Sequence, residues 1–93
     1  MRRIERKVFA LNEEVARLRR EAELTEGELN MHRHLADDAA RDAALDEGIE
    51  RAESRMADRD VATLVKALER TRRDLERAEA RRLELLRRMD DSR

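Results

Sequence analysis

Residues 1–29, MRRIERKVFALNEEVARLRREAELTEGEL, carry apolar side chains at alternating spacings of three and four. This is the heptad pattern of a coiled coil, in which two positions of each seven-residue repeat, a and d, form a seam that faces another helix. Because a lone helix cannot bury such a seam, the stretch predicts a protein that works through helix–helix contact. The residues predicted to form this oligomer or partner seam are Ile4, Val8, Leu11, Val15, Leu18, Ala22 and Leu29.

The composition of the whole chain favours long helices over a compact core. Charged residues make up 48% of the 93 residues, only 1% are aromatic, and proline is absent. Apolar residues that recur at helical spacing are typical of solvated helices, whereas scattered ones would indicate disorder. We therefore predict an all-α fold, an antiparallel helical hairpin (coiled coil) of two long helices that self-associates.

The heptad register of the first helix does not continue into the apolar stripe that begins at Val61. Gly48 can end a helix, and Asp58 or Asp60 can cap a new one. We predict a first helix over 1–46, with 1–29 as a dimerisation arm, then an acidic corner over 47–59, with or without a short helix. A second helix over 60–91 and a tail at 92–93 complete the chain. Gly27 is interpreted as a glycine tolerated inside the first helix, with a kink as the alternative.

Folding back at this corner would pair the two helices with Leu75 near Leu29. The first helix would then be the longer one, and its N-terminal turns would overhang without a partner in the same chain. The second seam is expected to change to an eleven-residue repeat, because Arg82 occupies a heptad a position and Leu86 follows as the next anchor. The residues predicted to form the hairpin core are Ala36, Ala39, Ala43, Val61, Leu64, Leu68, Leu75 and Leu86.

Charge is distributed unevenly along the chain. Residues 1–20 carry a net charge of +4, residues 21–60 carry −8 and residues 61–93 carry +3, which together give the formal charge of −1. A hairpin would bring the two basic ends together. Interleaved glutamates dilute the basic ends and no aromatic residues are available to stack on bases, so nucleic-acid binding is only an alternative.

Several residues point to surfaces outside the seam. Four large apolar residues off the a and d positions predict a surface for a partner protein or for a four-helix assembly: Phe9, Leu24, Met31 and Leu35. An acidic tip of the hairpin is predicted from Asp37, Asp38, Asp42, Asp46 and Glu47. The layout resembles that of factors that enter the secondary channel of bacterial RNA polymerase, and the resemblance implies a tip that reaches the catalytic magnesium.

Residues for catalysis and for metal binding are scarce. The chain has no cysteine, and His32 and His34 are two residues apart, so they point to different faces of a helix. We predict no enzyme activity, no cofactor, no metal and no small-molecule substrate. The longest apolar run, Val8 to Leu11, is too short for a membrane span or a signal peptide, so a cytoplasmic location is expected, and the excess of arginine over lysine suggests a bacterial source.

These observations predict a small coiled-coil interaction protein, an adaptor, structural or regulatory partner of a larger protein, that acts by helix–helix binding. Its expected partners are a second copy of itself and another protein. The alternatives are a transcription-related factor that binds RNA polymerase through the acidic tip and a nucleic-acid binder that uses the basic ends.

Overall fold

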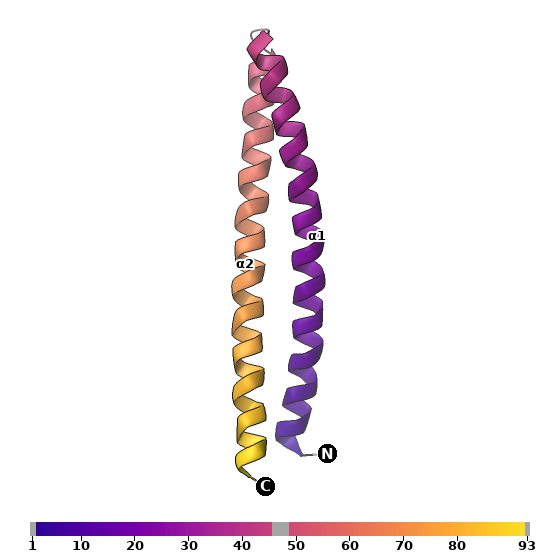
Figure 1. The fold of residues 1–93 in the computed structure, drawn as a ribbon, viewed down its shortest axis with the longest axis vertical. Helices are drawn as coiled ribbons and strands as arrows, with labels where there is room; N and C mark the ends of the chain where they lie inside the picture. The colour runs from indigo at the N-terminus through magenta and orange to yellow at the C-terminus, as the bar shows by residue number, and fades with distance from the viewer. Residues whose placement is uncertain (1, 46–48, 93) are drawn as a thin grey trace. The chain divides into compact units, whose positions relative to one another are not determined.

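The computed structural model describes residues 2–45 and 49–92, and it consists of two long helices. Helix α1 spans Arg3–Leu45 and helix α2 spans Ile49–Asp91, each with 43 residues (Figure 1). No strand occurs among these described residues. The prediction of an all-α helical hairpin is therefore confirmed.

Local sequence explains why both helices are so long. Ala, Leu, Glu and Arg are strong helix formers, and no proline interrupts either segment. Glu5 lies in the first turn of α1 and Arg88 in the last turn of α2, where each charge interacts favourably with the helix dipole. Helix α1 continues through Gly27, as the sequence predicts for a tolerated glycine.

The second helix begins earlier than predicted. Helix α2 starts at Ile49 instead of residue 60, so the part of the predicted corner over 49–59 is helical. Ser54 and Ala57 are half-buried and extend the seam of Val61 and Leu64 backwards in heptad spacing. The expectation of a helix start at Asp58 or Asp60 is wrong, because the heptad continues through them. The rest of the corner, residues 47–48, and Asp46, the predicted last residue of the first helix, lie outside the described residues.

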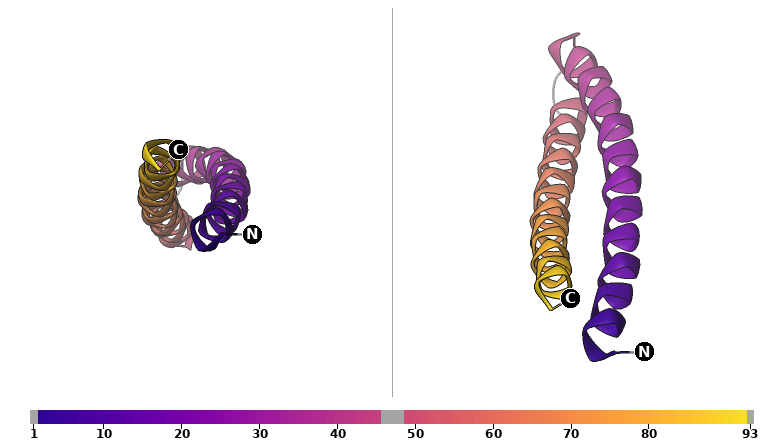
Figure 2. Two further views of the ribbon diagram at one scale, coloured as in Figure 1. Left: turned by 90° about the horizontal axis from the view of Figure 1, so that it is seen from below. Right: turned by 60° about the horizontal axis from the view of Figure 1, so that its bottom comes forward.

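The chain divides into two compact units, each built from a segment of α1 and a segment of α2. Unit 1 comprises 1–22 with 70–93, and unit 2 comprises 23–69. In unit 1 the start of α1 lies beside the end of α2, so the two segments are antiparallel (Figure 2). In unit 2 the end of α1 pairs with the start of α2 in the same sense.

The core of unit 1 is the heptad seam that opens the chain. Val15 and Leu18 are only 1% and 4% exposed, and they cluster with Ala78 of α2. Leu11 and Leu75 pack against this cluster. The cluster thus brings together a and d residues of both helices, Val15 and Leu18 of α1 with Leu75 and Ala78 of α2.

The core of unit 2 continues the same seam. Leu29, Ala36 and Leu68 are buried. The remaining core positions predicted in this unit are half-buried, namely Ala39, Ala43, Val61 and Leu64. Seven of the eight predicted core residues are thus buried or half-buried across the two units.

Leu86 is the exception, and Leu85 takes its place. Leu85 is 2% exposed, whereas Leu86 is 40% exposed. The expected change to an eleven-residue repeat is wrong, because the heptad continues through a half-buried Arg82 to Leu85 and Met89. The long aliphatic part of an arginine can occupy a seam position while its guanidinium reaches solvent, so a charged residue does not end the heptad.

The predicted overhang of the first helix is absent from the structure. Helix α2 begins eleven residues earlier than expected, and Leu75 packs against the cluster of Val15, Leu18 and Ala78 in unit 1, whereas Leu29 belongs to unit 2. The arm over 1–29 therefore packs against α2 of its own chain, in unit 1 up to Ala22. The prediction that its N-terminal turns stay unpaired within one chain is wrong, since the position of the turn sets the register of a hairpin.

Candidate functional site

The seam residues predicted to bind another chain are occupied within this one. In unit 1, Val8, Val15 and Leu18 are buried, and Ile4, Leu11 and Ala22 are half-buried. In unit 2, Leu29 is buried. In each unit the side chains that remain exposed lie mainly on the outer faces of the helices, away from the a and d positions.

One outer face of unit 1 carries three exposed apolar residues, which we call the Phe9 face: Phe9, Leu83 and Leu86. An ion pair shows which sides of the helices adjoin, since Arg19 lies 3.6 Å from Glu79 across the two helices. Asn12 precedes Arg19 by seven residues, and Leu86 follows Glu79 by seven residues. Asn12 and Leu86 therefore lie on the same sides of their helices as the two paired residues. Phe9 precedes Asn12 by three residues and so lies on the same face of α1. Leu83 precedes Leu86 by three residues and lies on the same face of α2.

An outer strip of α1 in unit 2 combines apolar and acidic residues. Leu24 is 70% exposed, and Met31 and Leu35 are also exposed. Residues four or seven positions apart lie on one face of a helix. Glu28 follows Leu24 by four residues and Asp38 follows Met31 by seven, so both lie on the same strip. We call this set the acidic strip: Leu24, Glu28, Met31, Leu35 and Asp38. The strip joins two sets that the sequence predicted separately, the partner surface and the acidic tip.

The other residues of the predicted acidic tip are placed only in part. Asp37 and Asp42 are exposed on α1. Asp38 forms an ion pair with Arg41 of the same helix. Asp46 and Glu47 lie outside the described residues, so the prediction of a tip that reaches a partner stays a prediction.

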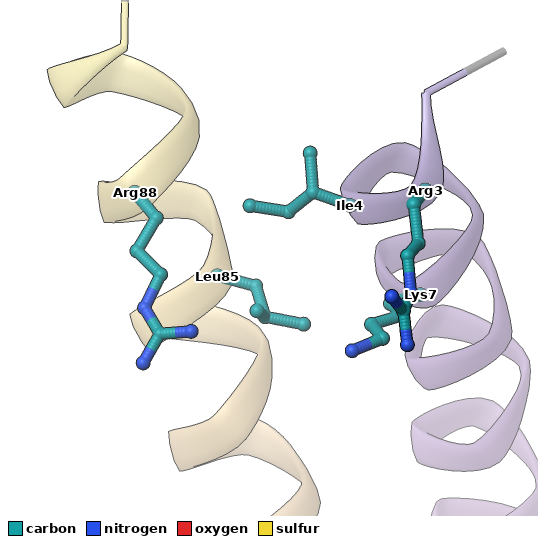
Figure 3. A pocket seen from close by; sticks show the side chains of 5 residues that line it. All are labelled: Arg3, Ile4, Lys7, Leu85 and Arg88. Atoms are coloured by element: carbon teal, nitrogen blue, oxygen red, sulfur yellow. The ribbon is translucent and has the colours of Figure 1, made fainter.

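A groove lies at the end of unit 1 where the helix termini meet. Ile4 of α1 and Leu85 of α2 line it between the helices, and Arg3, Lys7 and Arg88 surround it (Figure 3). The groove is open to solvent and has a volume of about 310 Å³. We call it the basic groove, because its apolar floor is flanked by three cationic side chains.

The cations of the basic groove differ in their partners. Arg88 donates from Nη2 to Glu84 Oε1 at 2.6 Å, so part of its charge is compensated. Within residues 2–45 and 49–92, neither Arg3 nor Lys7 forms an ion pair. The groove therefore has two uncompensated cations beside an aliphatic floor, a combination suited to a ligand that is both apolar and anionic.

Folding back gives the two units opposite charges. Unit 1 contains seven basic and four acidic residues in 1–22 and nine basic and six acidic residues in 70–93, a net charge of +6. Unit 2 contains six basic and thirteen acidic residues, a net charge of −7. The prediction that a hairpin brings the two basic ends together is confirmed.

The two histidines do not lie together. His32 is half-buried in the seam of unit 2, where it lines a shallow groove with Asp60, Thr63 and Leu64, while His34 is exposed. Among the described residues, no group of three or more His, Cys, Asp or Glu side chains could hold a metal ion. In the same part of the chain, every buried side-chain nitrogen or oxygen has a hydrogen-bond partner.

Some surface residues were not found from sequence. The basic groove depends on Leu85, which was missed because the heptad was not extended past Arg82. Met56 and Leu83 are also exposed, and neither was predicted as part of a surface. Counting the heptad backwards from Val61 and forwards from Leu75 would have assigned both residues to outer positions.

Comparison with known proteins gives no relative. No protein-family model matches the chain, and no curated protein or solved structure matches it. Across residues 2–45 and 49–92, neither helix has a stretch that is long and apolar enough to traverse a bilayer.

Proposed function

We propose that this protein is a helical-hairpin interaction module that binds other helical surfaces through its outer faces. The observation that carries the proposal is that the coiled-coil seam is filled within one chain while large apolar side chains remain exposed on outer strips. Apolar residues scattered singly over a surface are ordinary, but clusters such as the Phe9 face and the acidic strip are typical of interaction sites.

The mode of binding follows from the side chains available. An exposed helical strip with apolar anchors at spacings of seven and four can pack against a helix of a partner, as in a helical bundle. Leu24, Met31 and Leu35 provide such anchors, and methionine adapts to irregular partner surfaces. In this proposal the protein acts by binding and not by catalysis, as an adaptor or regulatory partner. A cytoplasmic setting, expected from the short apolar runs, and a bacterial source, expected from the excess of arginine over lysine, belong to this proposal.

Photo-crosslinking tests the proposed outer faces. p-Benzoylphenylalanine introduced at Met31 or at Phe9, in cells that make the protein, is expected to form covalent adducts with protein. Asn30 is the matched control, because it is exposed on α1 next to Met31 but points to a different side of the helix. Adducts of similar yield from all three positions, or none from Met31 and Phe9, would contradict the proposal.

A second candidate is binding of a polyanion such as nucleic acid to unit 1. The observation that favours it is the net charge of +6 on a unit that contains both chain ends. Several of the arginines there are paired with carboxylates, among them Arg19 with Glu79 and Arg17 with Glu21. A steep fall of oligonucleotide affinity with salt would support this candidate, and binding that is insensitive to salt would exclude it.

A further inference from the structure

We propose that the basic groove of unit 1 binds the acidic strip of unit 2 from a second copy of this chain. The proposal rests on the proposed function, since it names one partner and one pair of surfaces for an interaction module. It differs from the seam dimer expected from the sequence, because the seam stays closed within each chain.

The groove determines the chemistry of its occupant. Ile4 and Leu85 provide an apolar floor, while Arg3 and Lys7 provide two charges that have no carboxylate partner among the described residues. A purely apolar occupant would desolvate these cations without compensation, which is unfavourable. A small anion would leave the apolar floor uncovered. The groove therefore fits a surface on which aliphatic side chains and carboxylates alternate.

The acidic strip has this alternation. Met31 and Leu35 are adjacent on one face of α1, and Glu28 lies one turn before Met31. Asp38 lies one turn after Leu35, and its charge is partly compensated by Arg41 of the same helix. An aliphatic side chain of the strip can cover Ile4 and Leu85 while a flanking carboxylate meets Lys7 or Arg3. In Figure 3 the side chains of Arg3 and Lys7 lie on one side of this floor and that of Arg88 on the other.

The charges of the two units decide which surfaces of two copies meet. Contact between unit 1 at +6 and unit 2 at −7 is attractive, whereas contact between two like units is repulsive. Because every copy carries both a groove and a strip, one type of contact is sufficient for association. Screening over about 8 Å at physiological salt limits this preference to surfaces close to contact, so association is expected to weaken as salt rises.

Analytical ultracentrifugation with reversed charges tests the proposal. The wild-type chain is expected to associate reversibly as its concentration rises in low salt. The groove variant Arg3→Glu/Lys7→Glu and the strip variant Glu28→Lys/Asp38→Lys should each weaken self-association at least tenfold. An equimolar mixture of the two variants should restore association, because each reversed surface then finds a complementary one.

A matched control separates the groove from the general charge of unit 1. Arg20→Glu/Arg73→Glu changes the net charge of unit 1 by the same amount, at two exposed residues that do not line the groove. This control should keep at least half of the wild-type affinity. Circular dichroism at 222 nm checks that every variant remains helical, so that loss of folding is not mistaken for loss of binding.

Several results would overturn the proposal. These are a wild-type chain that stays monomeric at all concentrations, a control variant that loses as much affinity as the groove variant, or a mixture that does not restore association. If the wild-type chain is monomeric but binds a fluorescent oligonucleotide, and the groove variant does not, the groove has a polyanion as its occupant and the second-copy proposal is wrong. In each case protein adducts at Met31 would still support the proposed function, so the two failures are distinguishable.

Discussion

The guanidinium of Arg82 donates from Nη1 to Asn12 Oδ1 at 3.4 Å, and so joins residues 70 positions apart in the chain. Arg82 is half-buried at an a position of the seam of unit 1. The hydrogen bond gives its polar end a partner on α1 while its aliphatic part remains in the seam. A charged seam residue of this kind commonly sets register at some cost in stability.

Replacing Arg82 by leucine should therefore stabilise the hairpin. We expect Arg82→Leu to raise the free energy of unfolding by about 1 kcal/mol, because an apolar side chain replaces a partly desolvated charge in the seam. Asn12→Ala removes only the exposed hydrogen bond and should change stability by less than about 0.5 kcal/mol. Urea unfolding followed by circular dichroism measures both. A loss of stability in Arg82→Leu would show that the guanidinium contributes more than its burial costs.

The assignment of Leu85 to the core can be tested against its neighbour. Leu85→Ala should lower the free energy of unfolding by about 2 to 4 kcal/mol, because the side chain is almost fully buried. Leu86→Ala deletes the same atoms from an exposed position and should cost less than about 1 kcal/mol. Equal effects in urea unfolding, or the reverse order, would favour the eleven-residue repeat over the continuous heptad.

Gly27 offers a substitution that should stabilise α1. A Cβ added at Gly27 would meet no atom within 4 Å, and the residue lies inside the helix. Gly27→Ala should therefore raise the free energy of unfolding by roughly 0.5 to 1 kcal/mol, through the difference in helix propensity. Thermal unfolding followed at 222 nm is the measurement. A lower melting temperature in Gly27→Ala would mean that the conformational freedom of glycine is needed there.

The ion pair between Arg19 and Glu79 should contribute little. The two side chains are about half exposed and their charged atoms lie 3.6 Å apart. A double-mutant cycle with alanine at both positions should give a coupling energy of about 0.2 to 1 kcal/mol in low salt. In ~1 M NaCl the coupling should fall towards zero, because the screening length is then about 3 Å. A coupling energy that persists in high salt would contradict this prediction and would indicate that the pair is shielded from solvent ions.

Much of the fold follows from the spacing of apolar residues. The heptad from Ile4 to Ala43 predicts which side of α1 is buried, and the structure confirms it, because one side of a helix can meet only one neighbour. The partner of that side could not be predicted, since the same seam can bind α2 of its own chain or a second chain. The position of the turn decides between these outcomes, and helix-capping residues such as Asp58 and Asp60 gave the wrong position.

The candidate surfaces were predictable only in part. Leu24, Met31 and Leu35 could be found because they are large apolar residues off the seam. The basic groove could not be found, because it needs Lys7 and Arg88 to lie on opposite sides of the same aliphatic floor. That arrangement depends on the register between helices, which a shift of eleven residues changes completely.

The central claim is that the N-terminal seam is buried by α2 of the same chain. Because the protein has no cysteine, Ala16→Cys and Ala80→Cys allow spin labels at two exposed sites of unit 1. Double electron–electron resonance should give a distance on the order of 20 Å, from adjacent helices and the label arms, and it should persist when the labelled chain is diluted tenfold with unlabelled chain. One continuous helix would separate the labels by roughly 95 Å. That long distance, or a short one that vanishes on dilution, would contradict the account.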